Sequence, residues 1–371
     1  MSLPSGVRTV GIGSAVLGGA GKTLVAISYA QAYRAAGARV AFVAHGYNAA
    51  VRDPMVCEGN EDVQAVGDDT LVAARMLHGS GIEVWVGSDR NLTLREAARH
   101  SEIVVVDGLL QSRPRTLDRS VIVLDAASPF GSGACPPAGD LRGPVPALLS
   151  LCDEVVFVRD GFPRCGTCAE PIPWQSLLEH ARQSPHGFVR KTQQETLREG
   201  RRKTQHEMHQ KTHPHAVSQS LRELLRDFSG NMLPNREIFE RTAWLDVLGL
   251  SDGSRILPVS SVAQNVVGFA SLMAHPERVL TTLRLRGVVP ACVWHGPDHG
   301  PLTLRDQQKL RDLAREFRIS AWLVSTKCAT HFASSDIGAP LLSIEITSRL
   351  DPMPHAVLDC APCVPQDFLR S

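Results

Sequence analysis

Residues 18–23 of this 371-residue chain read Gly-Gly-Ala-Gly-Lys-Thr, between the apolar run 7–12 and the helix-like stretch 24–30. Glycines in such a strand–turn–helix let backbone N–H groups approach an anion, and the helix N-terminus adds positive partial charge. The lysine at this spacing reaches the β- and γ-phosphates, and the following hydroxyl holds Mg²⁺. The sequence therefore predicts a nucleotide phosphate loop made of the following residues: Gly18, Gly19, Ala20, Gly21, Lys22 and Thr23.

The loop departs from the common Gly-x4-Gly-Lys-Thr spacing at one position. That pattern has glycine at position 16, where this chain has Val16. Gly18 and Gly19 compensate in part for the missing glycine, because they keep the turn rich in residues without a side chain.

The first 160 residues alternate short apolar runs with helical stretches. Near-continuous apolar strands between helices predict a mostly parallel sheet with helices on both faces, an α/β fold of the P-loop NTPase type. The expected strands are Val7–Gly13, Arg39–Ala44, Glu83–Gly87, Glu102–Asp107, Ser120–Asp125 and Glu154–Val158. The expected helices are Lys22–Ala35, Thr70–Leu77 and Thr93–His100.

The same alternation returns after residue 255 and predicts a smaller C-terminal α/β lobe. Strands are expected at Ile256–Val262, Val288–Trp294 and Ala321–Ser325, and helices at Pro276–Arg286 and Leu304–Phe317. We therefore predict three parts: a nucleotide-binding core (1–160), an insertion (161–254) and the C-terminal lobe (255–371).

The predicted insertion contains a basic tract. Residues 188–215 hold seven Lys and Arg against three acidic residues, with four histidines between 206 and 215. Two interpretations stay open: a partly helical segment that meets anionic lipid head groups or an acidic partner, or a solvated, poorly ordered loop. The whole chain has a formal charge of only +1, so no overall field recruits nucleic acid, and we expect no nucleic-acid partner.

The cysteines and hydropathy indicate a chain on the cytoplasmic side of the membrane. No apolar run is long enough to span a bilayer, and we find no signal-peptide pattern. Nine cysteines are an odd number and mostly scattered, which is typical of reduced thiols. The pairs Cys165/Cys168 and Cys360/Cys363 leave a four-thiolate zinc site open as an alternative.

Three further places carry residues suited to chemistry. Asp107 ends the apolar run 104–106, as expected of a carboxylate that reaches Mg²⁺ at the carboxyl edge of a sheet. Asp68 and Asp69 precede an expected helix, where capping is an equally good explanation. Asp298-His299 follow an expected strand, in a turn that fits a catalytic loop.

Several segments in order resemble the tetraacyldisaccharide 4'-kinases, over residues 9–160 and 255–332. The family's Gly-Asn-x3-Gly-Gly-x-Gly-Lys-Thr loop is similar to residues 13–23, which accounts for Val16. Its Ser-Arg-Gly-Tyr, Gly-Asp-Glu-Pro, Asp-Arg, Asp-Asp-Gly-Phe-Gln-His and Leu-Pro-Ala-Gly-x-Leu-Arg-Glu-Pro segments resemble residues 44–47, 67–70, 89–90, 107–112 and 136–144. Its Pro-Glu-Arg, Pro-Asp-His and Thr-x-Lys-Asp segments resemble residues 276–278, 297–299 and 326–328.

The resemblance implies an enzyme that phosphorylates the 4'-hydroxyl of a lipid A disaccharide 1-phosphate, with ATP and Mg²⁺, peripherally at the cytoplasmic face of the bacterial inner membrane. It implies Asp68 as general base paired with His299, Lys22 at the transferring phosphoryl group, and Thr23 and Asp107 as Mg²⁺ ligands. An anionic membrane surface is the second expected partner, beside the lipid acceptor.

The chain departs from the family at four of these positions. Gly108 replaces the second Asp of the Asp-Asp-Gly-Phe-Gln-His segment, and Ser112 replaces its His. His45 replaces the Arg of Ser-Arg-Gly-Tyr, and Cys328 replaces the Asp of Thr-x-Lys-Asp. Family members also begin with a membrane-associating helix of several tens of residues, so we expect either a truncated start or membrane contact through residues 188–215. Two alternatives stay open: a nucleotide-binding protein without phosphotransfer, and a P-loop kinase for another sugar or lipid.

Overall fold

The described part of the chain is built around one mixed sheet. Its strand order is β11-β10-β12-β13-β8-β7-β6-β1-β5-β2-β4-β3, and β9 pairs with β8. The computed structural model describes residues 6–46, 49–108, 117–161, 238–253, 255–273, 276–296, 302–332 and 335–354. The chain divides into two units, residues 1–162 with 236–371, and residues 163–235. Only the first unit contains described residues, and all that follows concerns that unit.

The N-terminal elements alternate along the chain as their apolar periodicity dictates. The strands are β1 (Arg8–Ser14), β2 (Val40–Val43), β3 (Met55–Val56), β4 (Glu83–Val86), β5 (Ile103–Asp107), β6 (Arg119–Asp125) and β7 (Glu154–Asp160). The helices are α1 (Lys22–Ala35), α2 (Val63–Val66), α3 (Asp68–Leu77), α4 (Arg90–Arg99) and α5 (Val145–Ser150). Among these strands, only β3 pairs antiparallel, with β4.

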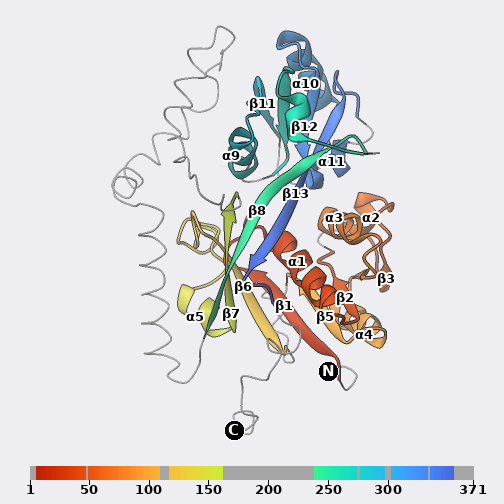
Figure 1. The fold of residues 1–371 in the computed structure, drawn as a ribbon, viewed down its shortest axis with the longest axis vertical. Coiled ribbons are helices and arrows are strands. Elements are labelled where there is room, and N and C mark those ends of the chain that lie inside the picture. The colour runs from red at the N-terminus through yellow and green to blue at the C-terminus, as the bar shows by residue number, and fades with distance from the viewer. Residues whose placement is uncertain are drawn as a thin grey trace. The chain divides into compact units, whose positions relative to one another are not determined.

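The C-terminal elements extend the same sheet. The strands are β8 (Phe239–Ser251), β9 (Ile256–Leu257), β10 (Val267–Ser271), β11 (Cys292–His295), β12 (Ala321–Ser325) and β13 (Leu341–Asp351). The helices are η2 (Val259–Val262), α9 (Glu277–Leu285), α10 (Leu304–Glu316) and α11 (Thr326–Phe332). Strand β8 runs parallel to β7 and antiparallel to β13, so these long strands join the two parts of the sheet (Figure 1).

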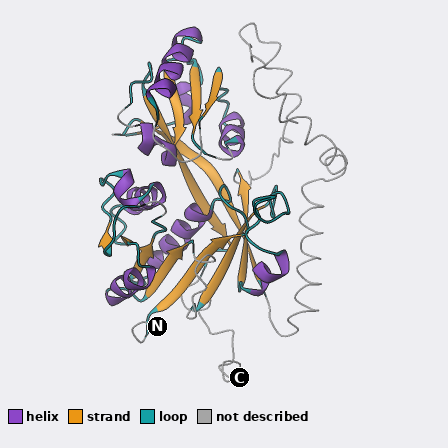
Figure 2. Ribbon diagram, turned by 180° about the vertical axis from the view of Figure 1, so that it is seen from behind, coloured by secondary structure: helices purple, strands orange, loops and turns teal. Residues whose placement is uncertain are grey.

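Alternate residues of the N-terminal strands pack on opposite faces, as expected for a sheet covered on both sides. Val40, Phe42 and Val105 lie in the core cluster that includes α1 and α3, while Ala41 and Val104 lie in the cluster with Ala97 and Ala98 of α4. Figure 2 shows helices beside the strands in both parts of the sheet. The predicted mostly parallel α/β fold is therefore confirmed. No helix among the described residues combines the length and apolar character needed to cross a bilayer.

The predicted N-terminal strands and helices agree with the structure to within a few residues at each end. Three predictions for the C-terminal part were wrong. The strand expected at Ile256–Val262 is a two-residue strand followed by the short helix η2, because Pro258 interrupts it. The strand expected at Val288–Trp294 begins only at Cys292. Residues 239–251, predicted within the insertion, form β8 of the main sheet.

Candidate active site

The glycine-rich loop joins β1 to α1 at the centre of the sheet. Gly18, Gly19 and Gly21 all have positive φ, and Gly21 is the N-cap of α1, with φ 79°. A Cβ at Gly21 would come within 3.4 Å of Leu245 and Val158 and 3.6 Å of the Arg278 guanidinium. These are ordinary contact distances, so it is the left-handed backbone conformation that favours glycine at this position, in a tight strand-to-helix turn as predicted.

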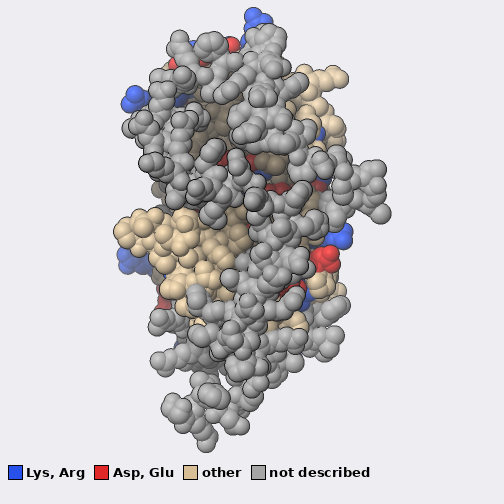
Figure 3. All heavy atoms as spheres, turned by 90° about the vertical axis from the view of Figure 1, so that its left-hand side faces the viewer, with Lys and Arg blue, Asp and Glu red and all other residues tan. Residues whose placement is uncertain are grey.

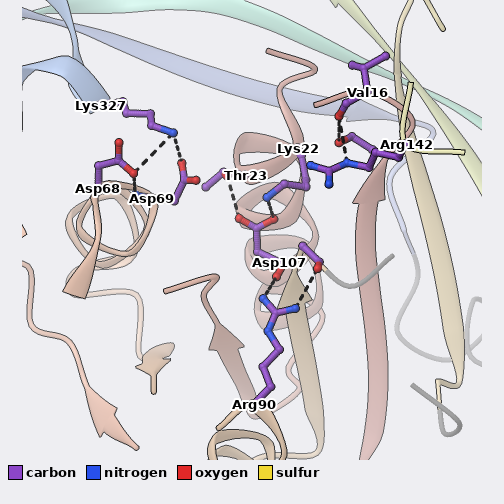
Figure 4. Close-up of polar contacts among 11 residues, drawn as sticks. Val16, Lys22, Thr23, Asp68, Asp69, Arg90, Asp107, Arg142 and Lys327 are labelled. Carbon is purple, nitrogen blue, oxygen red and sulfur yellow. Dashed lines mark hydrogen bonds and ion pairs between the residues drawn. The ribbon is translucent and has the colours of Figure 1, made fainter. Parts of the chain in front are cut away.

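Val16 has a structural role at the start of this loop. It is buried and pairs with Leu141 as an isolated β-bridge. Its carbonyl accepts from the Arg142 Nε at 3.1 Å, and the Leu17 N–H donates to the Asp140 carbonyl at 2.8 Å (Figure 4). The residue that breaks the common spacing thus lies where the backbone of the loop is bound to the segment 140–142, with its own side chain buried.

Lys22 and Thr23, the first residues of α1, both contact Asp107 at the end of the neighbouring strand β5. Lys22 forms an ion pair with one carboxylate oxygen, and the Thr23 hydroxyl donates to the other at 2.8 Å. Burial alone raises the pKa of Asp107, but Lys22, Thr23 and Arg90 outweigh it and hold that pKa below its usual value. Asp107 is therefore an ionised carboxylate with almost no exposed surface.

The pair Thr23 and Asp107 fits a magnesium ion. Both offer hard oxygen ligands, both lie at the carboxyl edge of the sheet beside the phosphate loop, and the carboxylate is ionised. Mg²⁺ takes few protein ligands and completes its shell with phosphates and water. Such a site needs no larger cluster, and within the described ranges no group of three or more His, Cys, Asp or Glu side chains is arranged to hold a metal.

Arg90, at the start of α4, secures the backbone that carries Asp107. Its guanidinium donates to the Asp107 carbonyl at 2.6 Å and to the Gly108 carbonyl at 2.9 Å. Gly108 has φ 80°, and a Cβ there would lie 2.5 Å from Cδ2 of His45. The two departures from the family, Gly108 and His45, are therefore spatially coupled: the imidazole occupies the space that a side chain at 108 needs.

Restoring the second carboxylate by Gly108→Asp should destabilise the fold. We expect the free energy of unfolding to fall by about 1–3 kcal/mol, because an L side chain is strained at this φ and the His45 ring blocks its Cβ. Urea unfolding measures this loss. Gly79→Asp is the matched control, since Gly79 has φ 72° and open space around its Cβ. If Gly108→Asp costs no more than Gly79→Asp, or if His45→Ala fails to recover part of the loss, the coupling is absent.

Asp68 and Asp69 begin α3 and face helix α11. Lys327 Nζ lies 3.0 Å from Asp69 Oδ1 and 3.6 Å from Asp68 Oδ1, and His331 Nε2 lies 3.6 Å from Asp68 Oδ2. Gly67, not Asp68, is the N-cap of α3, but both aspartates lie in the first turn, where Asp68 Oδ1 accepts from the Asp69 N–H at 2.8 Å, so they also suit the helix N-terminus. Burial lowers the pKa of Lys327, but Asp69 and Asp68 reverse this and raise it.

The acidic pair and the phosphate loop form one site. The Asp107 carboxylate also raises the pKa of Lys327, so the two groups lie within electrostatic reach of each other. In Figure 4, Thr23 and Asp107 lie between the group of Asp68, Asp69 and Lys327 on the left and Lys22 on the right. Three carboxylates, of Asp68, Asp69 and Asp107, therefore lie near the end of the sheet where the phosphate loop begins α1, with the Thr23 hydroxyl and the ammonium groups of Lys22 and Lys327.

Arg278 of α9 joins the C-terminal elements to the phosphate loop. Its guanidinium pairs with Asp125 and Asp160, at the ends of β6 and β7, and donates to the Gly19 carbonyl at 3.4 Å. Burial raises the pKa of Asp160 to about 6, although Arg278 opposes this shift. Asp160 is therefore an acid that the folded protein holds partly protonated near pH 6.

This shift gives the stability a measurable pH dependence. The pKa of Asp160 is about 6 in the folded state and about 3.8 in the unfolded state, so the protonated acid favours the folded state. The free energy of unfolding that this adds is fully present below pH 4 and is lost as the pH rises through 6. The loss is up to about 3 kcal/mol. Relative to the wild type, Asp160→Asn should gain about 2–3 kcal/mol of unfolding free energy between pH 4 and pH 7, measured by urea unfolding. A difference between the two proteins that stays constant with pH contradicts this.

All the predicted site residues except His299 lie in the described part of the chain. Gly18, Gly19, Ala20, Gly21, Lys22, Thr23, Asp68 and Asp107 all lie in the described residues. His299, Ser112, the tract 188–215 and both Cys-x2-Cys pairs lie outside the described residues. Cys328 is buried in the core, where its sulfur accepts from the Leu272 N–H, so this departure from the family faces away from the site.

Sequence reasoning missed the residues that complete the site. Arg278 and Lys327 lie in segments that resemble the family, but the resemblance assigns them no role, and His331 lies outside those segments. Lys327 and His331 are spaced i, i+4, which places both on one face of a helix. The i, i+4 spacing could have predicted that Lys327 and His331 share a helix face, but nothing in the sequence shows that α11 packs against the start of α3.

Comparison with known proteins agrees with this site. A family model described as Tetraacyldisaccharide-1-P 4'-kinase matches residues 2–243. A tetraacyldisaccharide 4'-kinase of Hyphomonas neptunium is 37% identical over 157 residues, which are 42% of this chain and 46% of the relative. Another from Jannaschia sp. is 36% identical over 154 residues, 41% and 45% of the two chains. The chain thus spans about half the length of the curated relatives it matches.

A solved structure extends the likeness to the fold. LpxK from Aquifex aeolicus, crystallised in complex with ATP, is similar with a TM-score of 0.56 at 14% identity, over 94% of this chain and 86% of that one. At this identity the likeness concerns the fold alone. The family model, however, covers well over half of the sequence, including the phosphate loop, Asp68 and Asp107. The chain therefore belongs to the tetraacyldisaccharide-1-P 4'-kinase family.

Proposed function

We propose that this chain transfers the γ-phosphoryl group of ATP to the 4'-hydroxyl of a lipid A disaccharide 1-phosphate. The observation that carries the proposal is that Asp107, which contacts Lys22 and Thr23, lies within electrostatic reach of Lys327, the partner of Asp68. A phosphate loop alone serves many reactions, whereas a carboxylate beside it suits transfer to a hydroxyl. The family membership and the names of the relatives supply the acceptor class.

The residues of the loop bind and orient the triphosphate. Backbone N–H groups of the glycine-rich turn and the N-terminus of α1 attract the phosphates, and no side chain caps this described helix end. Lys22 exchanges its ion pair with Asp107 for the β- and γ-phosphates and stabilises the charge that develops during transfer. Mg²⁺, held by Thr23 and Asp107, supplies additional neutralisation of phosphate charge when bound.

Asp68 acts as the general base in this proposal. A sugar hydroxyl is a weak nucleophile, and a carboxylate within hydrogen-bond reach takes its proton as the bond to phosphorus forms. The Asp69 N–H donates to Asp68 Oδ1 at 2.8 Å, and Lys327 adds positive charge beside the same oxygen. The resemblance pairs Asp68 with His299 as well, and this pairing stays part of the proposal.

Membrane contact belongs to the proposal too, because the acceptor is a lipid. The basic tract 188–215 is the segment we propose for contact with anionic lipid. On the face seen in Figure 3, the described residues present scattered acidic and basic side chains rather than one basic field. The formal charge of only +1 over the whole chain favours a local contact over attraction of the whole molecule to the membrane surface.

One observation favours a second candidate, a protein that binds nucleotide without transferring phosphate. Gly108 lacks the carboxylate that the family has beside Asp107, and His45 fills its place. Loss of one carboxylate near a metal lowers affinity by about 10- to 100-fold. The intact Lys22, Thr23, Asp107 and Asp68 oppose this candidate, because a protein without transfer needs no base.

An acceptor panel with γ-labelled ATP and Mg²⁺ tests the proposal. We expect label in the lipid A disaccharide 1-phosphate and none in the same acceptor methylated at the 4'-oxygen. Label in an unrelated sugar or lipid alone would identify a kinase for another acceptor. Tight ATP binding with no transfer to any acceptor would support the second candidate.

A further inference from the structure

Helix α11 presents two side chains to the proposed base. Lys327 and His331 are one helical turn apart, and both face the start of α3. Lys327 and the Asp69 N–H lie on the Oδ1 side of the Asp68 carboxylate, at 3.6 and 2.8 Å. His331 lies on the other side, with its Nε2 3.6 Å from Oδ2. The two oxygens of Asp68 therefore have different partners.

The His331 Nε2 atom is buried and has no hydrogen-bond partner among the described residues. The exposed fractions of its side chain and that of Asp68 are 14% and 12%, so water reaches this contact poorly. A buried ring nitrogen without a partner costs free energy that a hydrogen bond recovers. A movement of about half an ångström brings Nε2 to hydrogen-bond distance of Oδ2.

We propose that His331 is a positioning residue for Asp68, a role that rests on the proposed function of Asp68 as base. Its Nε2–H donates to Oδ2 and fixes the plane of the carboxylate, with Oδ1 held by the Asp69 N–H and Lys327. The remaining lone pair of Oδ2 then faces the acceptor hydroxyl in one orientation. Misplacement of a reacting group by about 1 Å costs up to about 100-fold in rate.

This role differs from that of His299. The pairing of Asp68 with His299 comes from the resemblance to the family, whereas the contact with His331 comes from the packing of α11 on α3. His331 contacts neither the phosphate loop nor Asp107 in any described hydrogen bond or ion pair. We therefore expect its loss to act on turnover and to leave nucleotide affinity unchanged.

Two substitutions of similar bulk separate the hydrogen bond from simple packing. His331→Phe keeps a ring without a donor, and His331→Gln keeps an N–H at the position of Nε2. We expect kcat to fall about 10- to 100-fold in His331→Phe and less than about fivefold in His331→Gln, with the KM for ATP within about twofold in both. Thr330→Val, which loses only a hydrogen bond to the Lys327 carbonyl, is the control on the same helix and should retain kcat.

A spectroscopic measurement tests the contact without any acceptor. In the full chain with ¹⁵N-labelled histidine, the His331 resonances should show a proton on Nε2, and Asp68→Ala should change that spectrum. Three outcomes would each overturn the role of His331, provided that the wild type transfers phosphate. The first is an unchanged kcat in His331→Phe, and the second is a loss of kcat of equal size in His331→Phe and His331→Gln. The third is a His331 spectrum that does not respond to Asp68→Ala. Absence of transfer by the wild type would instead overturn the proposed function.

Discussion

Replacing Asp68 by asparagine should lower kcat by about 10²–10⁴-fold and leave ATP affinity within about twofold, because general-base assistance is lost while the phosphate loop stays intact. Asn keeps the size of the side chain but accepts no proton. The measurement is steady-state transfer of labelled phosphate to the lipid acceptor, with nucleotide binding followed by calorimetry. Both readouts are required, since only their difference assigns the loss to the chemical step.

The matched control is Asp69→Asn. Asp69 lies next in the chain, begins the same helix and makes the shorter contact to Lys327, at 3.0 Å. If the loss of rate came only from removing negative charge beside Lys327, Asp68→Asn and Asp69→Asn would both lower kcat. The base assignment predicts a much larger loss at Asp68 than at Asp69, and losses of equal size would contradict it.

Lys22→Met should abolish most transfer, with a loss of about 10³-fold, because the ammonium group stabilises the developing phosphate charge. It should also destabilise the protein. Asp107 is fully buried and keeps its charge chiefly through Lys22, so the variant leaves only Thr23 and Arg90 to offset the burial of this carboxylate. Breaking such a buried pair costs about 3–5 kcal/mol, which urea unfolding detects.

A double variant separates the two effects of Lys22. Lys22→Met with Asp107→Asn removes both charges, so most of the lost stability should return while transfer stays absent. Stability equal to that of Lys22→Met alone would show that the ion pair does not carry the effect. Full transfer in Lys22→Met would exclude the proposed role of the lysine.

The N-terminal half of the fold was predictable from the sequence because its strands are buried on both faces. Runs such as Val104–Val106 and Val121–Leu124 are continuous and apolar, and the turns between them hold glycine or aspartate. The site residues of this half follow from the same pattern, since Lys22, Thr23 and Asp107 lie where a strand ends or a helix begins. The sequence positions of these three residues therefore predict most of their arrangement in space.

Strand β8 escaped prediction because its inward positions include charged residues. Arg241 is buried and pairs with Glu154, which also pairs with Arg119 and accepts from the Tyr29 hydroxyl at 2.6 Å. Buried Asp246 pairs with Arg286 of the α9 C-terminus. Apolar periodicity fails where a strand satisfies buried charges through partners distant in sequence, and only the folded chain shows those partners.

The neighbours of Asp68 were beyond sequence reasoning for a related reason. The pairing of Asp69 with Lys327 joins residues 258 positions apart. Single-sequence patterns describe one element at a time, so they place Lys327 and His331 on a helix face without telling which element that face meets. The same limit applies to Gly108 and His45, whose mutual contact explains two departures that look independent in the sequence.

The position of phosphate in the product tests the central claim most directly. Incubation of the full chain with ATP, Mg²⁺ and the lipid A disaccharide 1-phosphate, followed by ³¹P NMR and mass spectrometry of the lipid, shows both whether transfer occurs and where. We expect a second phosphomonoester on the 4'-oxygen, formed by the wild type and lost in Asp68→Asn. Phosphate at another position, or no phosphorylated lipid from a protein that binds ATP, would contradict it.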